Sequence, residues 1–169
     1  MRQTLKRVPL ATACVLLSAM LLACGSAPPP SQWADAQKET KDKAAVSKEA
    51  FDGKAFNKFF PKVEAPYDLV YEQDKKGTAI ANLKRNGMEV AKLSVTDTIS
   101  NPEAAEKYKD APNKLEGYPH TKVGSHAYGV LVGDRIQVQV KSMDDSFPDS
   151  ECDEWIKKFN LDGLSQLVK

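Results

Sequence analysis

The chain has 169 residues, with 24 basic and 23 acidic side chains and a formal net charge of +1. The two signs are interspersed, and no basic stripe of the kind that binds nucleic acid occurs. A nucleic-acid partner is therefore not expected.

The N-terminal segment has the layout of a secretory signal. Arg2, Lys6 and Arg7 precede an apolar run over residues 8–22, and a small residue then stands before a cysteine. The run is about 15 residues long and contains Pro9, whereas a membrane-spanning helix needs roughly 20 apolar residues. A signal peptide is therefore favoured over a retained helix.

The motif that closes this segment, Leu21-Leu22-Ala23-Cys24, resembles the lipobox of bacterial lipoproteins. The resemblance implies that residues 1–23 are removed as a signal peptide. It also implies that the thiol and the new amino group of Cys24 carry acyl chains such as palmitate, which anchor the protein in a membrane of the cell envelope. Gly25, in place of an aspartate after the cysteine, resembles outer-membrane sorting and a periplasmic location if the cell has an outer membrane.

The residues after Cys24 are typical of a tether. Over residues 24–46 the chain contains Pro28-Pro29-Pro30 and is then rich in Lys, Glu, Asp, Gln and Ala. A solvated helix over residues 33–46 is an alternative, since these residue types favour helices. Trp33 could lie at the membrane interface or pack on the domain. We expect a single globular domain over residues 47–169.

The domain begins with an aromatic cluster. Phe51, Phe56, Phe59 and Phe60 precede Pro61, which indicates one or two short helical turns that end at the proline. Phe56, Phe59 and Phe60 are candidates for a site that binds a small apolar ligand, and the alternative is that they belong to the core.

Three strands are expected next, at residues 67–72, 78–84 and 88–97. A three-residue loop, Arg85-Asn86-Gly87, separates apolar from charged side chains better than a two-residue turn does. The apolar face that this register predicts consists of Ala79, Ala81, Leu83, Ala91, Leu93 and Val95.

Asn101-Pro102-Glu103 has the features of a helix start, and the helix should run to about Lys109. A strand near residues 120–124 follows. After it, Gly133-Asp134 divides a hairpin whose second strand alternates strictly between apolar and polar residues.

A two-residue turn at Gly133-Asp134 would place three apolar side chains of the first strand on the face that holds Arg135, Gln137 and Gln139. These three side chains are Tyr128, Val130 and Val132. Either a helix or the phenylalanine segment covers them, or they form a surface for a partner such as an envelope protein.

The last helix is expected over residues 150–160, with Ser150 and Asp153 as a capping-box-like pair. Residues 164–168 form a short final turn. The elements then follow the order α-βββ-α-βββ-α, which predicts an α+β fold with an antiparallel sheet of about six strands and helices packed on it.

No residue pattern here is typical of a catalytic or cofactor site. His120 and His126 would lie roughly 20 Å apart on an extended strand, too far to share a metal ion. Asp97 and Asp134 stand at strand ends, where a turn role is favoured over acid/base catalysis. We therefore expect a protein without a cofactor, a metal ion or enzymatic activity.

Six acidic residues near the last helix could attract calcium, but they lack the spacing of an EF-hand loop, and helix capping explains half of them. They are Asp144, Asp145, Asp149, Glu151, Asp153 and Glu154. Cys152 shares one helix face with Trp155, Ile156 and Phe159, so its thiol is expected to be buried.

Three short motifs make the globular part similar to a group of uncharacterised small exported bacterial proteins. The motifs are Val95-Thr96-Asp97-Thr98, Val132-Gly133-Asp134-Arg135 and Leu161-Asp162-Gly163-Leu164. This similarity implies no activity. The expected function is that of an envelope lipoprotein whose non-catalytic domain binds or supports another envelope component, and the alternative is a carrier or sensor of a small apolar ligand.

Overall fold

The computed structural model describes residues 46–169, apart from the side chain of Gln73. In chain order, the helices and strands are the 3-10 helix η1 (Gly53–Phe59), β1 (Tyr67–Lys75), β2 (Thr78–Arg85), β3 (Met88–Asp97), the 3-10 helix η2 (Thr98–Ser100), α2 (Pro102–Glu106), β4 (Asn113–Leu115), β5 (Tyr118–Gly124), β6 (Ala127–Val132), β7 (Ile136–Ser142), α3 (Asp149–Ile156) and α4 (Leu161–Leu167).

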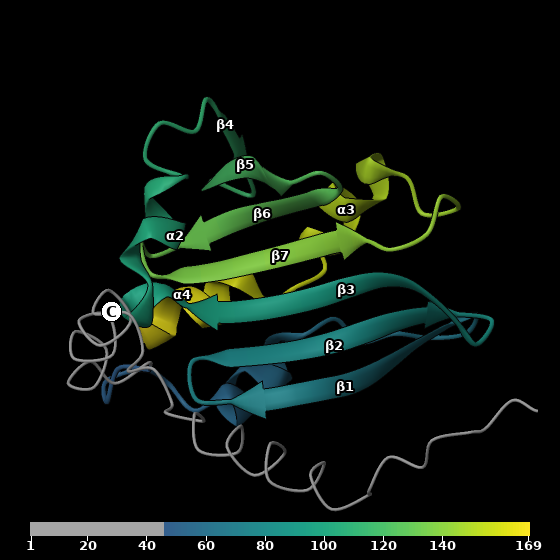
Figure 1. Ribbon diagram of the computed structural model, residues 1–169, viewed down its shortest axis with the longest axis horizontal. Helices are drawn as coiled ribbons and strands as arrows, with labels where there is room; N and C mark the ends of the chain where they lie inside the picture. The colour runs from purple at the N-terminus through teal and green to yellow at the C-terminus, as the bar shows by residue number, and fades with distance from the viewer. Residues whose placement is uncertain (1–45) are drawn as a thin grey trace, which may run out of the picture. The chain divides into compact units, whose positions relative to one another are not determined.

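The strands form a seven-stranded sheet in the order β1-β2-β3-β7-β6-β5-β4, and every neighbouring pair is antiparallel (Figure 1). The predicted α+β class with an antiparallel sheet is confirmed. The predicted count of about six strands missed β4, which is only three residues long. The first helical segment is a 3-10 helix, and the chain closes with two helices rather than one helix and a turn.

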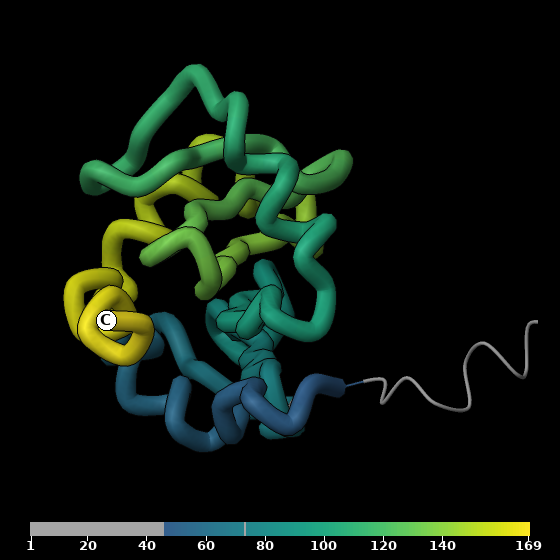
Figure 2. Tube along the Cα trace, turned by 90° about the vertical axis from the view of Figure 1, so that its left-hand side faces the viewer, coloured from purple at the N-terminus to yellow at the C-terminus, as the bar shows by residue number. Residues whose placement is uncertain are grey.

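One face of the sheet carries the core. The helices α3 and α4 and the segment η1 pack against this face (Figures 1 and 2). Alternate strand residues point into it and meet the aromatic side chains of the helices. The buried sheet residues of this cluster are Ala79, Ala81, Leu83, Val90, Ala91, Leu93, Val95, Val130, Val132, Ile136, Val138 and Val140.

The β2–β3 hairpin has the predicted apolar face but a different turn. Arg85 pairs with Met88, so the turn has two residues, Asn86 and Gly87, both with positive φ. A β-bulge then shifts the register by one residue and leaves Val90 unpaired in the β2–β3 ladder. The predicted side-chain pairs are thereby restored, and Val90 is buried in the core rather than on the opposite face.

The β6–β7 hairpin corrects the prediction for Tyr128, Val130 and Val132. Val132 pairs with Ile136, so the loop has three residues and not two. All three side chains therefore share the core face with the apolar residues of β7. Val130 and Val132 are completely buried and Tyr128 is partly buried, so the predicted partner surface is wrong.

The loop is longer than predicted because Arg135 is held by a contact outside the hairpin. Its carbonyl oxygen accepts hydrogen bonds from the Thr98 backbone N–H at 3.0 Å and from Thr98 Oγ1 at 2.8 Å. Gly133 and Asp134 both have positive φ, as the tight turn requires.

The opposite face of the sheet is covered only in part among the described residues. The segment after η2 lies on this side of the sheet, away from α3 and α4 (Figure 2). Its Tyr108 is buried over Gly129 and accepts a hydrogen bond from Gln137 Nε2 at 2.9 Å. A side chain at Gly129 would clash with the Tyr108 hydroxyl, so this glycine permits the close approach. Helix α2 itself ends at Glu106, shorter than predicted.

The helix start at the C-terminal end also differs from the prediction. Helix α3 begins at Asp149, Pro148 occupies the N-cap position, and no side chain caps it. Ser150 therefore lies inside the helix. The predicted helical face is confirmed for Cys152, Trp155 and Ile156, whereas α3 ends at Ile156, earlier than predicted, and Phe159 is buried beyond its end.

Candidate functional site

The predicted lipidation site, Cys24, lies outside the described residues, as do Trp33 and residues 33–45 of the segment for which a helix was the alternative to a tether. Within the described part of the chain, no helix is long and apolar enough to span a membrane. The anchor therefore stays a prediction from the sequence.

The segment through which the chain enters the domain is fastened to the end of the sheet. Ser47 N–H donates to Ser100 Oγ at 2.8 Å, and Lys76 Nζ donates to the Lys48 carbonyl at 2.7 Å. Gly77 N–H donates to the Phe51 carbonyl at 2.7 Å. These hydrogen bonds join the first described residues of the chain to the turn between β1 and β2 and to η2.

An ion pair between the buried Asp97 and the partly exposed Arg135 lies where this segment meets the sheet. Arg135 Nε and Nη2 each donate to a different carboxylate oxygen of Asp97 at 2.8 Å. The backbone N–H groups of Phe51 and Ile99 donate to the same carboxylate at 3.1 Å. Arg135 Nη2 also donates to the Glu49 carbonyl, and its guanidinium lies 4.6 Å from the centre of the Phe51 ring.

These contacts set the charge state of Asp97. Burial acts to raise the pKa of this carboxyl, but the hydrogen bonds from Arg135, Phe51 and Ile99 and the guanidinium charge outweigh burial and hold the pKa below its usual range. Asp97 also caps η2 through its bond to Ile99 N–H. The expected strand-end role of Asp97 is thus part of a larger polar junction.

The junction explains two of the three motifs noted in the sequence. Val95-Thr96-Asp97-Thr98 supplies the carboxylate and the Thr98 donors, and Val132-Gly133-Asp134-Arg135 supplies the guanidinium and the carbonyl. In the third motif, a side chain on Gly163 would press on Phe59 and Asn160. All three motifs therefore have structural roles, and sequence reasoning missed Arg135 because its partner lies 38 residues away.

The candidate apolar ligand site is filled by the protein itself. Phe56, Phe59 and Phe60 are buried in the core cluster. The ring of Phe60 lies 5.2 Å from that of Phe159 and 5.4 Å from that of Tyr71, measured between ring centres. Phe59 only borders an open surface depression near α4. These three phenylalanines thus follow the core alternative.

Strand β5 is joined to the helices by polar contacts along its core-facing side. Tyr118 OH donates to Asp162 Oδ1 at 3.1 Å, and His120 Nε2 lies 2.9 Å from Asp153 Oδ1. Lys122 Nζ donates to Asp149 Oδ2 at 3.3 Å, and that hydrogen bond raises the pKa of Lys122. These three side chains are two residues apart along the strand, so they share one face and meet aspartates on both α3 and α4.

The two histidines meet different carboxylates. His126 Nδ1 lies 3.2 Å from Asp149 Oδ1, whereas His120 is buried, contacts Asp153 and stacks on Tyr128. Among the described residues, no group of three or more histidine, cysteine or acidic side chains could hold a metal ion. The two histidine–aspartate contacts therefore hold β5 and the β5–β6 turn against α3.

Five of the six acids considered for calcium make local contacts with other side chains. Asp144 accepts from the backbone and side chain of Ser146, and these bonds lower its pKa. Glu151 lies 4.0 Å from Arg85, and Glu154 pairs with Lys157 at 2.7 Å. Helix capping was expected to explain half of these acids; Asp149 and Glu151 do lie in the first turn of α3, but no side chain caps the helix.

Comparison of the chain with protein-family models, with curated proteins and with solved structures gives no match. The roles above therefore come from the contacts of this chain alone.

Proposed function

We propose that the protein is a lipid-anchored component of the cell envelope, whose α+β domain binds or supports another envelope component without catalysis. The observation that carries the proposal is the motif Leu21-Leu22-Ala23-Cys24 at the end of a short apolar run with basic residues before it. Acyl chains on Cys24 would supply the attachment, because each buried methylene contributes about 0.8 kcal/mol and more than one chain makes it durable.

The polar contacts of the domain support a binding role over a catalytic one. The Asp97 carboxylate, paired with Arg135, also accepts two backbone N–H groups, and His120 on β5 contacts Asp153 on α3. Each of these groups already has a structural task. The same contacts fasten the entry segment to the sheet, which suits a domain held by one end of its chain.

The first test is lipid labelling in the native host. The full-length protein should incorporate an alkyne-bearing fatty acid, and its mature form should lack residues 1–23 and carry acyl groups at position 24. Cys24→Ser should lose the label and keep the signal segment, because the thiol is the acyl acceptor. Membrane fractionation, in-gel fluorescence of the label and intact mass are the measurements.

The matched control is Cys14→Ser, which changes a cysteine inside the predicted signal segment and should keep full labelling. An unmodified thiol at Cys24 in the native protein, or a mature chain that still begins at Met1, would contradict the proposal.

We propose the sheet face opposite the core as the partner surface, in place of Tyr128, Val130 and Val132. Among residues 46–169, no helix lies in front of this face of β1, β2, β3 and β7 (Figure 1). It carries partly exposed, uncharged polar side chains from neighbouring strands, namely Asn82, Ser94, Thr96 and Gln139, whereas Gln137 on the same face is held by Tyr108. Lys92, paired with Glu72 at 2.8 Å, lies beside them.

The test is site-specific photocrosslinking in cells. A benzophenone amino acid at Ser94 or Gln139 should yield a discrete product of higher mass, because both positions would lie against the partner. The same probe at Lys158, in the turn after α3, or at Gln166, on α4, should yield none, although both residues are exposed. Equal products from both sets, or products only from Lys158 and Gln166, would remove the sheet face from consideration.

A further inference from the structure

The sulfur atoms of the described residues differ sharply in access to solvent. They belong to Met88, Met143 and Cys152. Met88 is 70% exposed and Met143 is 46% exposed, whereas Cys152 is completely buried. Burial raises the pKa of the Cys152 thiol to about 11, so little thiolate forms near neutral pH. An oxidant in solution therefore reaches the two thioethers before the thiol.

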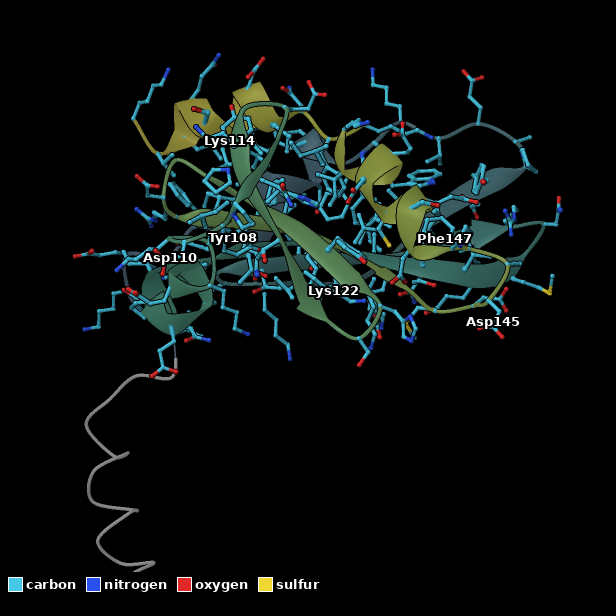
Figure 3. The ribbon with its side chains drawn as sticks, turned by 90° about the horizontal axis from the view of Figure 1, so that it is seen from above. Tyr108, Asp110, Lys114, Lys122, Asp145 and Phe147 are labelled. Carbon is cyan, nitrogen blue, oxygen red and sulfur yellow. The ribbon has the colours of Figure 1, made fainter. Side chains whose placement is uncertain are left out.

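The two methionines lie at the same end of the sheet. Met88 is the first residue of β3, and Met143 directly follows β7, the strand beside it. The Met143 N–H donates to the Val90 carbonyl at 2.9 Å, which holds the backbones together at this point. The loop after Met143 extends to Asp145, far from Tyr108 at the other end of the described domain (Figure 3).

Neither methionine contributes to the buried core. Conversion of a thioether to a polar sulfoxide disrupts a core when the methionine is packed inside it. At Met88 and Met143 the added oxygen would point into water instead. The fold can therefore accept both oxidations while the surface at this end changes from apolar to polar.

We propose that Met88 and Met143 form a reversible oxidation site that reacts with hydrogen peroxide or hypochlorous acid. With peroxide, the sulfur attacks one oxygen, the O–O bond breaks, an S–O bond forms and water leaves. The sulfur is oxidised by two electrons and the peroxide is reduced. A methionine sulfoxide reductase with a dithiol reverses the step, since the sulfoxide oxygen leaves as water and the dithiol becomes a disulfide.

The significance of the site rests on the proposed function. Cleavage before Cys24 would remove Met1 and Met20, and acylation would occupy the Cys24 sulfur. Met88 and Met143 would then be the accessible, unmodified sulfurs of the mature chain, with the oxidant supplied from outside the cell.

For the test, the purified full-length protein is kept folded in detergent solution and treated with hydrogen peroxide. Peptide mass spectrometry should show one added oxygen at Met88 and at Met143, at rates within about threefold of a free methionyl peptide. Met88 should react faster than Met143. Cys152 should stay unmodified, near-ultraviolet circular dichroism should not change, and the two stereospecific reductases with dithiothreitol should remove both oxygens.

Met88→Leu and Met143→Leu should each take up one oxygen fewer than the parent protein. Cys152 should react with peroxide only when urea unfolds the protein. Oxidation of Cys152 in the native protein at the rate of Met88, or methionine rates more than about tenfold below the peptide, would overturn the site. These rates do not depend on acylation, so failure here and failure of lipid labelling are separate results.

Discussion

Arg135→Leu is expected to lower the free energy of unfolding by about 3–5 kcal/mol, because it leaves the buried carboxylate of Asp97 without its charged partner. The Asp97 side chain is fully buried beside Arg135. Two of the four hydrogen bonds to Asp97 would be lost, and the contact between Arg135 and the Glu49 carbonyl would be lost with them. Urea unfolding followed by the fluorescence of the buried Trp155 measures the change.

The matched control is Lys92→Met, which breaks the solvent-exposed pair between Lys92 and Glu72. Exposed pairs contribute little, so this variant should differ from the parent by less than about 1 kcal/mol. Equal losses in the two variants would show that the Asp97–Arg135 pair contributes no more to the free energy of unfolding than an exposed ion pair does.

The pH dependence provides an independent readout of the same pair. The pKa of Asp97 lies below its usual range, so the carboxylate contributes stability above its unfolded pKa of about 4, and this contribution is lost as the pH falls through the folded pKa. In Arg135→Leu the Asp97 carboxylate is buried without its charged partner, so its protonation would stabilise the folded variant. The stability difference between parent and variant should therefore narrow below about pH 4.

Val130→Asp is expected to cost about 3–5 kcal/mol, the range for an uncompensated buried charge. Val130 is completely buried in the core cluster, on the face against which α3 packs, and pairs with Val138 across the strands. Far-ultraviolet circular dichroism during thermal unfolding is the measurement, with refolding checked after cooling.

Gln139→Asp is the control for this variant. Gln139 lies on β7 next to Val138, and its side chain points to the opposite, partly exposed face. Its substitution should change stability by no more than about 0.5 kcal/mol. A larger loss at Gln139 than at Val130 would support the two-residue turn and reverse the assignment of the faces.

The two hairpins show how far the sequence determines register. In β2 and β3 one set of alternate residues is apolar and the other is largely charged or polar, so the apolar pairs were predictable although the loop length was wrong by one. A bulge that leaves Val90 unpaired in the ladder absorbed the difference. The periodicity of α3 was equally clear, because a helix that packs by one face has one apolar stripe.

Only the tertiary structure decided the register of β6 and β7. Both faces of β6 are apolar, since helices cover one and Tyr108 the other, and the sequence offers no contrast to choose between them. The loop length there depends on Arg135, which is held by Asp97 and Thr98 from another part of the chain. The contacts of β5 with α3 are equally non-local, because His120 meets Asp153 only after β5 has joined the sheet and α3 has packed on it.

The sequence by itself determined the signal-like segment, the α+β class and the residues of the main apolar faces, because these depend on composition and on local periodicity. The tertiary structure decided which of the two apolar faces of β6 packs against the helices, which side chains fill the aromatic cluster and which charges meet. These outcomes depend on the free energies of contacts between distant segments, and the local residue pattern does not contain that information.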